Sequence, residues 1–147
     1  MPYKVVFCHG MDTNSLGPKY RSLVDAFGVD HVIAPDCEGI YDLKERVRIV
    51  EEATKGMTDL VLVGSSFGGR VSVVFALKHP EQVVGLVLCN PALGTPLRPP
   101  IYLPETVILH AVNDAVIPIA VSEKFCLDHK VRLVRVENED HKFDKSH

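Results

Sequence analysis

Short apolar runs alternate with amphipathic segments along most of this chain, and this alternation limits its fold more than any other feature. The runs are rich in β-branched residues, as expected for strands, while the segments between them repeat apolar residues at helical spacing. Strands that alternate with helices predict βαβ units and a parallel sheet. The expected strands are residues 3–8, 31–34, 60–63, 84–89, 106–110 and 131–136.

The segments between these strands carry start and stop signals for helices. Pro18 and Gly28 mark the two ends of the first one. Asp42 and Glu45 form a capping-box pattern at the start of the second. The helices are therefore expected over residues 18–27, 43–54, about 68–80 and 118–128, whereas the proline-rich stretch 90–104 has no helical period and predicts a loop.

The central strands are apolar throughout, which is typical of strands buried on both faces. The last expected strand is interrupted by Arg132 and Arg135, as an edge strand can be. We therefore predict an α/β fold in one domain over residues 1–147, with a six-stranded, mainly parallel sheet and helices on both faces. Ligands bind such sheets beyond the carboxyl ends of the strands, so functional residues are expected directly after strands.

Composition and charge disfavour several classes of function. The net charge is −3 and the basic residues are scattered, which argues against a nucleic-acid partner. No apolar stretch approaches the ~20 residues of a membrane span, and no signal-peptide pattern is visible, so we expect a cytoplasmic protein. The cysteines are widely spaced and are expected to be reduced. No metal-ligand or nucleotide-binding motif occurs, so no cofactor is expected.

The segment Gly64-Ser65-Ser66-Phe67-Gly68 lies between an expected strand and an expected helix. This G-x-S-x-G pattern in that context is typical of a nucleophile elbow, a sharp turn that exposes a serine hydroxyl above the sheet. Glycine on each side lets the strand and the helix approach closely. Ser66 is therefore the candidate nucleophile, and Ser65 is the alternative, although it lacks the symmetric glycines.

Two more polar residues follow later strands, in the order acid then histidine. Asp114 comes just after the strand at 106–110, and His141 comes after the last strand. An acidic residue there can orient a histidine that acts as general base on the serine. A turn or a helix cap is the alternative role for Asp114. His110 is the main rival of His141, because it lies close to Asp114 in sequence.

The pair His9-Gly10 directly follows the first strand and precedes Met11. In α/β hydrolases, which the G-x-S-x-G motif in this context resembles, one oxyanion donor comes from this loop and another from the residue after the serine. We therefore predict that the N–H groups of Met11 and Phe67 stabilise the oxyanion. A structural role within the loop is expected for the imidazole of His9.

These residues, in this order, resemble the α/β-hydrolase superfamily. The short chain, together with Asn90-Pro91-Ala92, is similar to its small members without a lid, such as YqiA-type esterases. The stretch 90–104 replaces the helical cap of larger relatives, so no cap domain is expected. The resemblance implies a serine esterase or thioesterase acting on small or exposed acyl substrates through an acyl-enzyme. The alternatives are a peptidase or amidase, and a binding module on the same fold with vestigial activity.

Overall fold

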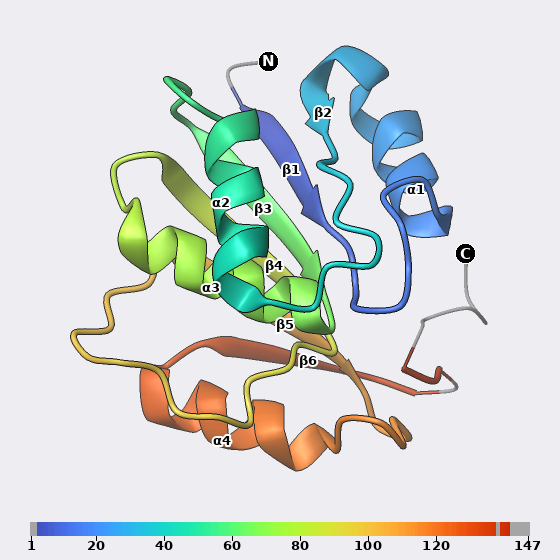
Figure 1. Cartoon of the computed structure of the whole chain (residues 1–147). Coiled ribbons are helices and arrows are strands. Elements are labelled where there is room, and N and C mark those ends of the chain that lie inside the picture. Colours follow the sequence, from blue (N-terminus) through green and yellow to red (C-terminus); the bar gives the residue numbers. More distant parts are fainter. Residues whose placement is uncertain (1–2, 138, 142–147) are drawn as a thin grey trace.

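A computed structural model of the chain describes residues 3–137 and 139–141. Its centre is a six-stranded sheet with the strand order β2-β1-β3-β4-β5-β6 (Figure 1). Every strand pair is parallel, so the sheet is wholly and not only mainly parallel. The strands are β1 (Lys4–Cys8), β2 (Val32–Ile33), β3 (Leu60–Ser65), β4 (Val83–Cys89), β5 (Glu105–Ala111) and β6 (Arg132–Val136).

The helices lie close to the predicted ranges. They are α1 (Pro18–Phe27), α2 (Leu43–Ala53), α3 (Phe67–Lys78) and α4 (Ile119–His129), with a 3-10 turn over Val29–His31 that shortens the second strand. The Asp42 carboxylate caps α2 by accepting from the N–H of Glu45 at 3.1 Å. The Glu45 side chain does not complete the capping box, since it pairs with Arg48 instead.

The register of the strands shows which helices share a face. Ile108 is aligned with Leu88, and Leu88 with Gly64, so the three residues face the same side. Gly64 lies against α3, and His110, two residues after Ile108, bonds to Ser122 of α4. Helices α2 and α3 contact one another, so α2, α3 and α4 cover one face. The β1–α1–β2 crossover runs the other way along the sheet, and right-handed connections therefore put α1 on the opposite face.

This reversal of direction occurs between β1 and β3, which are neighbours in the sheet. Such a switch point opens a crevice at the carboxyl ends of the two strands, where ligands bind in open α/β sheets. His9 and Gly10 follow β1, and Ser66 follows β3. The topology thus brings the two N-terminal motifs of the sequence to one place.

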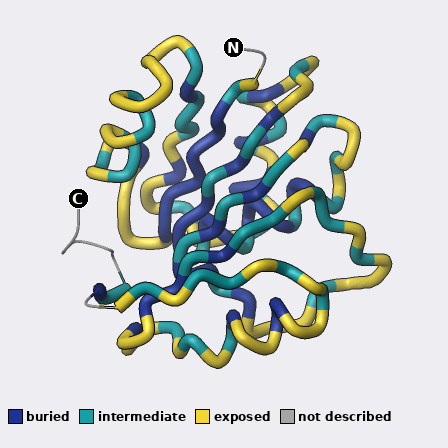
Figure 2. The backbone as a smooth tube through the Cα atoms, turned by 180° about the vertical axis from the view of Figure 1, so that it is seen from behind, coloured by how far each residue is buried: buried dark blue, intermediate teal, exposed yellow. Residues whose placement is uncertain are grey.

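The core lies between the sheet and the α2–α3–α4 layer. Leu62, Phe75, Leu88 and Ile108 are fully buried there, and truncating such a side chain to alanine typically costs about 2–5 kcal/mol. Seen from behind, buried residues gather on the central strands, and the outer turns of the helices are exposed (Figure 2). Residues 90–104 contain neither helix nor strand. Within the described residues, no helix is long and apolar enough to cross a bilayer.

Candidate active site

Ser66 lies at the turn between β3 and α3, with φ 55° and ψ −117°. A positive φ is strained for serine and persists only where the surroundings enforce it. Two glycines make the turn possible. A Cβ on Gly68 would lie 2.0 Å from the carbonyl oxygen of Cys8, and a Cβ on Gly64 would lie 2.5 Å from that of Gly68. The backbone here makes the sharp strand-to-helix turn that the G-x-S-x-G pattern predicts.

The backbone of Ser66 is fixed from both sides. Its N–H donates to the carbonyl of Cys89 at 3.0 Å, and its own carbonyl accepts from the N–H groups of Gly69 and Ala92 at 3.0 and 2.9 Å. The end of β4 and the loop after it therefore hold the turn in place. The serine hydroxyl projects from a rigid backbone position.

A chain of two hydrogen bonds joins Ser66, His141 and Asp114. The Ser66 hydroxyl donates to Nε2 of His141 at 2.8 Å, and the Nδ1–H of His141 donates to Oδ2 of Asp114 at 2.7 Å. The carboxylate is fully buried, and the imidazole is 17% exposed. The structure brings together three residues from the carboxyl ends of β3, β5 and β6. This arrangement suits proton transfer from the hydroxyl to the imidazole.

Both carboxylate oxygens of Asp114 have partners, and they serve different purposes. Oδ1 accepts from the N–H groups of Val116 and Ile117, each at 2.8 Å. Oδ2 faces His141. Asp114 therefore both supports this turn and contacts His141, whereas the sequence left the two placements as alternatives.

His110 is engaged elsewhere. Its Nδ1 accepts from the hydroxyl of Ser122 at 2.6 Å, and its Nε2–H donates to the carbonyl of Ile117 at 2.8 Å. Nε2 also lies 3.4 Å from Oδ2 of Asp114. The side chain is fully buried between β5 and α4. His110 thus supports the turn that carries Asp114, whereas His141 contacts the serine.

Asn90, at the end of β4, is a site residue whose role the sequence did not reveal. It is fully buried and has a φ of 44°. Its Oδ1 accepts from the N–H of Ala111 at 2.7 Å, and its Nδ2 donates to the carbonyls of His141 and Asp140 at 2.7 and 3.3 Å. The Asn90 side-chain amide therefore joins the backbone at Asp140 and His141 to the end of β5. Its position directly after a strand was the available signal.

The loop after β1 lies against the serine. A Cβ on Gly10 would be 3.6 Å from the Cβ of Ser66. The N–H groups of Met11 and Phe67 have no hydrogen-bond acceptor among the described residues. Two unused donors on the segments that flank a serine hydroxyl are what an oxyanion site requires.

Two buried basic side chains support this loop. His9 accepts from the N–H of Cys37 at 2.8 Å through Nε2, so its Nδ1–H donates to the carbonyl of Gly10 at 2.8 Å. Burial lowers the pKa of His9, which favours the neutral ring. Arg46 of α2 is 1% exposed and bonds to the same loop. Sequence reasoning missed Arg46, although it falls on the apolar stripe of its helix.

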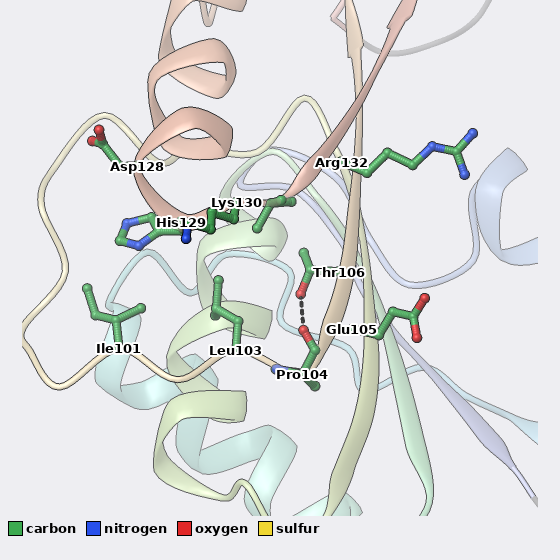
Figure 3. A pocket seen from close by; sticks show the side chains of 10 residues that line it. Ile101, Leu103, Pro104, Glu105, Thr106, Asp128, His129, Lys130 and Arg132 are labelled. Carbon is green, nitrogen blue, oxygen red and sulfur yellow. Dashed lines mark hydrogen bonds between the residues drawn. The ribbon is translucent and has the colours of Figure 1, made fainter.

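A cavity of about 530 Å³ lies at the opposite end of the sheet, where β5 and β6 begin (Figure 3). Its charged side chains do not converge, since Glu105 and Arg132 extend to one side while Asp128 and His129 lie toward the other. No group of three or more metal-binding side chains occurs in the described part of the chain.

The parallel sheet, the elbow and the short β4–β5 connection are those of an α/β hydrolase without a lid. The hydrolase family described as "Serine aminopeptidase, S33" matches residues 31–104, half of the chain, and the chain belongs to this family.

Solved structures and curated relatives agree with this assignment. A hydrolase of the α/β superfamily from Xanthomonas campestris pv. campestris superposes with a TM-score of 0.80 at 21% identity, covering 97% of this chain and 88% of that one. A serine hydrolase without lid from Xanthomonas campestris gives 0.71 at 18% identity, with 97% and 74% covered. Phytyl ester synthase 1 of Arabidopsis thaliana is 33% identical over 105 residues, 65% of this chain and 15% of the relative. The chain spans between 9% and 37% of the length of five curated relatives.

Proposed function

We propose that the protein is a serine hydrolase that cleaves carboxylic esters or thioesters, with Ser66 as nucleophile, His141 as general base and Asp114 as the group that orients the imidazole. The observation that carries this proposal is the hydrogen-bond chain from the Ser66 hydroxyl through His141 to Asp114, with donor–acceptor distances of 2.8 and 2.7 Å. A hydroxyl is a weak nucleophile by itself, and an adjacent oriented base is what activates it.

The reaction follows from this geometry in two halves. Ser66 attacks the acyl carbonyl while His141 takes the hydroxyl proton, and the N–H groups of Met11 and Phe67 stabilise the oxyanion. His141 then returns the proton to the leaving alcohol or thiol as the acyl-enzyme forms. Water, deprotonated by the same imidazole, releases the acid and regenerates the serine.

The short β4–β5 connection limits the substrates that suit this site. Residues 90–104 form no helix that could cover the site, so small acyl groups or acyl groups displayed on a larger molecule suit it. The relative named phytyl ester synthase supports ester chemistry. The family description names an aminopeptidase, which makes a peptide amide the competing substrate.

A fluorophosphonate probe read by intact mass tests the nucleophile. We expect one label on the wild type and on Ser65→Ala, and none on Ser66→Ala. Ser65 is the matched control because it is the adjacent buried serine. An unlabelled but folded wild type would contradict the proposal and would favour a binding module on this fold.

A second assay separates esters from peptides. Matched acetyl compounds with p-nitrophenol, thiophenol and p-nitroaniline leaving groups are compared by kcat/KM. We expect the ester and the thioester to be cleaved faster than the anilide. Faster cleavage of aminoacyl anilides would replace the esterase assignment with a peptidase.

A further inference from the structure

Arg46 is an unusual side chain in this fold because it is a charged group in the core. It lies on α2, the residue is 1% exposed, and no carboxylate of the described residues forms an ion pair with it. By residue volume, Arg46 is the largest of the fully buried residues that the structure describes. Burying a charge is costly unless hydrogen bonds compensate, so its partners show what it holds.

Among the residues that the structure describes, every hydrogen bond of Arg46 goes to a backbone carbonyl. Nη1 donates to His9 and Gly10 at 2.9 and 3.2 Å, and Nη2 donates to Met11 at 3.2 Å. Nε donates to the carbonyl of Ile40 at 2.6 Å, which fixes the base of the side chain. Three consecutive carbonyls of the loop after β1 therefore converge on one planar cation.

The orientation of these carbonyls decides where the neighbouring N–H groups point. In a planar trans peptide, the N–H of Met11 points opposite to the C=O of Gly10. That carbonyl accepts from Arg46, from the Nδ1–H of His9 at 2.8 Å and from the hydroxyl of Thr13 at 3.3 Å. The Met11 N–H therefore points away from the side of the loop that faces α2, and within residues 3–137 and 139–141 it has no acceptor.

Arg46 also reaches the other half of the site. Its guanidinium carbon lies 5.1 Å from the centroid of the Phe67 ring, within the range of a cation–π contact. Phe67 carries the second unused N–H, next to Ser66. One buried cation therefore contacts both segments that supply the expected oxyanion donors.

We propose that Arg46 is a positioning residue of the oxyanion site, fixing the Gly10–Met11 peptide and the Phe67 side chain so that both N–H groups face the developing negative oxygen. This inference rests on the proposed function and adds to it a residue outside the Ser66, His141 and Asp114 set. Its positive charge behind the peptide also favours an anion on the far side. Burial lowers the pKa of Arg46, but an arginine stays protonated at neutral pH.

The test compares Arg46→Lys and Arg46→Met with Arg48→Met, a change of an exposed arginine on the same helix. Each variant is assayed for kcat and KM on p-nitrophenyl acetate, and for inhibition by an alkyl trifluoromethyl ketone, which forms a tetrahedral oxyanion adduct with serine. Active sites are counted by the p-nitrophenol burst, so loss of folded protein does not mimic loss of rate.

Removing one side-chain donor from the oxyanion site of a serine protease lowers kcat by about 10²–10³-fold. We expect a smaller loss of about 10- to 100-fold for both Arg46 variants, since the donors stay but lose their orientation. KM should change little, and the ketone Ki should rise in proportion to the fall in kcat. Arg46→Lys keeps the charge but lacks the planar fork of donors, so its kcat should lie between those of Arg46→Met and the wild type.

Failure of this inference is distinct from failure of the proposed function. If wild type and Arg46 variants take the fluorophosphonate label equally fast and hydrolyse ester equally well, the function stands and the role of Arg46 is wrong. If kcat falls but the ketone Ki does not change, Arg46 acts on the fold alone. Should neither Arg46 variant fold, Phe67→Leu removes the ring that the Arg46 guanidinium contacts. This variant must lower kcat and raise the ketone Ki together, or the inference fails.

Discussion

The two ends of the sheet differ in how far their polar side chains are buried and hydrogen-bonded. At the carboxyl end, His9, Asn90, His110 and Asp114 are at least 93% buried, and each of them bonds to another buried group or to the backbone of a site loop. At the amino end, the 530 Å³ cavity is lined by charged residues that do not converge. Asp128 there accepts from Lys124 of the same helix at 2.9 Å, and Lys124 lowers the pKa of Asp128.

This difference shows why the cavity at the amino end is not by itself a functional site. Volume alone brings no chemistry, because solvated charges on separate segments have no fixed geometry. Burying the polar groups at the carboxyl end is unfavourable unless they are hydrogen-bonded. The hydrogen bonds that offset this desolvation free energy also fix the groups in one arrangement. Substitutions of the carboxyl-end groups that contact Ser66 or hold His141 should therefore change activity, and substitutions at the amino end should change stability alone.

The largest effect is expected from the histidine that contacts the serine. His141→Ala should lower kcat by about 10⁴-fold with little change in thermal stability, because it removes the proposed general base but no core packing. His110→Gln is the matched control. It should lower the Tm by several degrees, since it disturbs bonds to Ser122 and Ile117, but keep most of the activity per folded molecule. Equal loss of activity in both variants would reassign the base.

Asn90→Gly is the next variant. Glycine accepts the φ of 44° without strain, so the change removes the amide and adds no backbone clash. We expect kcat to fall about tenfold because the His141 carbonyl loses its tether. The free energy of unfolding should fall by about 1–3 kcal/mol, because the N–H of Ala111 loses its partner. The check is the rate of labelling at saturating fluorophosphonate. A wild-type rate in Asn90→Gly would show that the backbone at His141 keeps its position without the Asn90 amide.

Most of the fold could be predicted from residue patterns, because strand and helix signals are local. The elbow was recognisable for the same reason, since Gly64 and Gly68 stand in sequence beside Ser66. The roles of Asn90 and Arg46 could not be predicted. Their hydrogen bonds join residues 51 and 36 positions apart, and periodicity carries no information about such pairs. His110 was ambiguous in sequence because nearness to Asp114 along the chain does not say which nitrogen faces which group.

A smaller effect, on stability, is expected at the amino end from Glu51. Its carboxylate accepts from Lys78 at 2.9 Å and from His79 at 2.6 Å, joining the ends of α2 and α3. These bonds lower the pKa of Glu51. The stability they contribute is present above the unfolded-state pKa of about 4.3 and is lost as the pH falls through the lower folded-state pKa.

Glu51→Gln should therefore cost at most about 1 kcal/mol at pH 7, as expected for a pair with partial exposure. In urea unfolding, the difference from wild type should shrink as the pH falls below the unfolded-state pKa, and kcat at pH 7 should not change. A difference that persists in acid would mean that packing, and not charge, links the two helices.

The smallest expected effect has the opposite sign. Lys130 ends α4 in the left-handed region, with φ 56° and ψ 46°, and the next N–H, that of Val131, bonds back to Cys126. Glycine is favoured at such a position because the left-handed conformation costs a side-chain-bearing residue about 1–2 kcal/mol. Part of that gain is offset by the greater freedom of glycine in the unfolded chain. Lys130→Gly should thus raise the free energy of unfolding by about 0.5–1 kcal/mol and leave kcat/KM within twofold, although Lys130 lines the large cavity. A marked change in kcat/KM would show that the amino-end cavity takes part in the reaction, and the contrast between the two ends of the sheet would no longer hold.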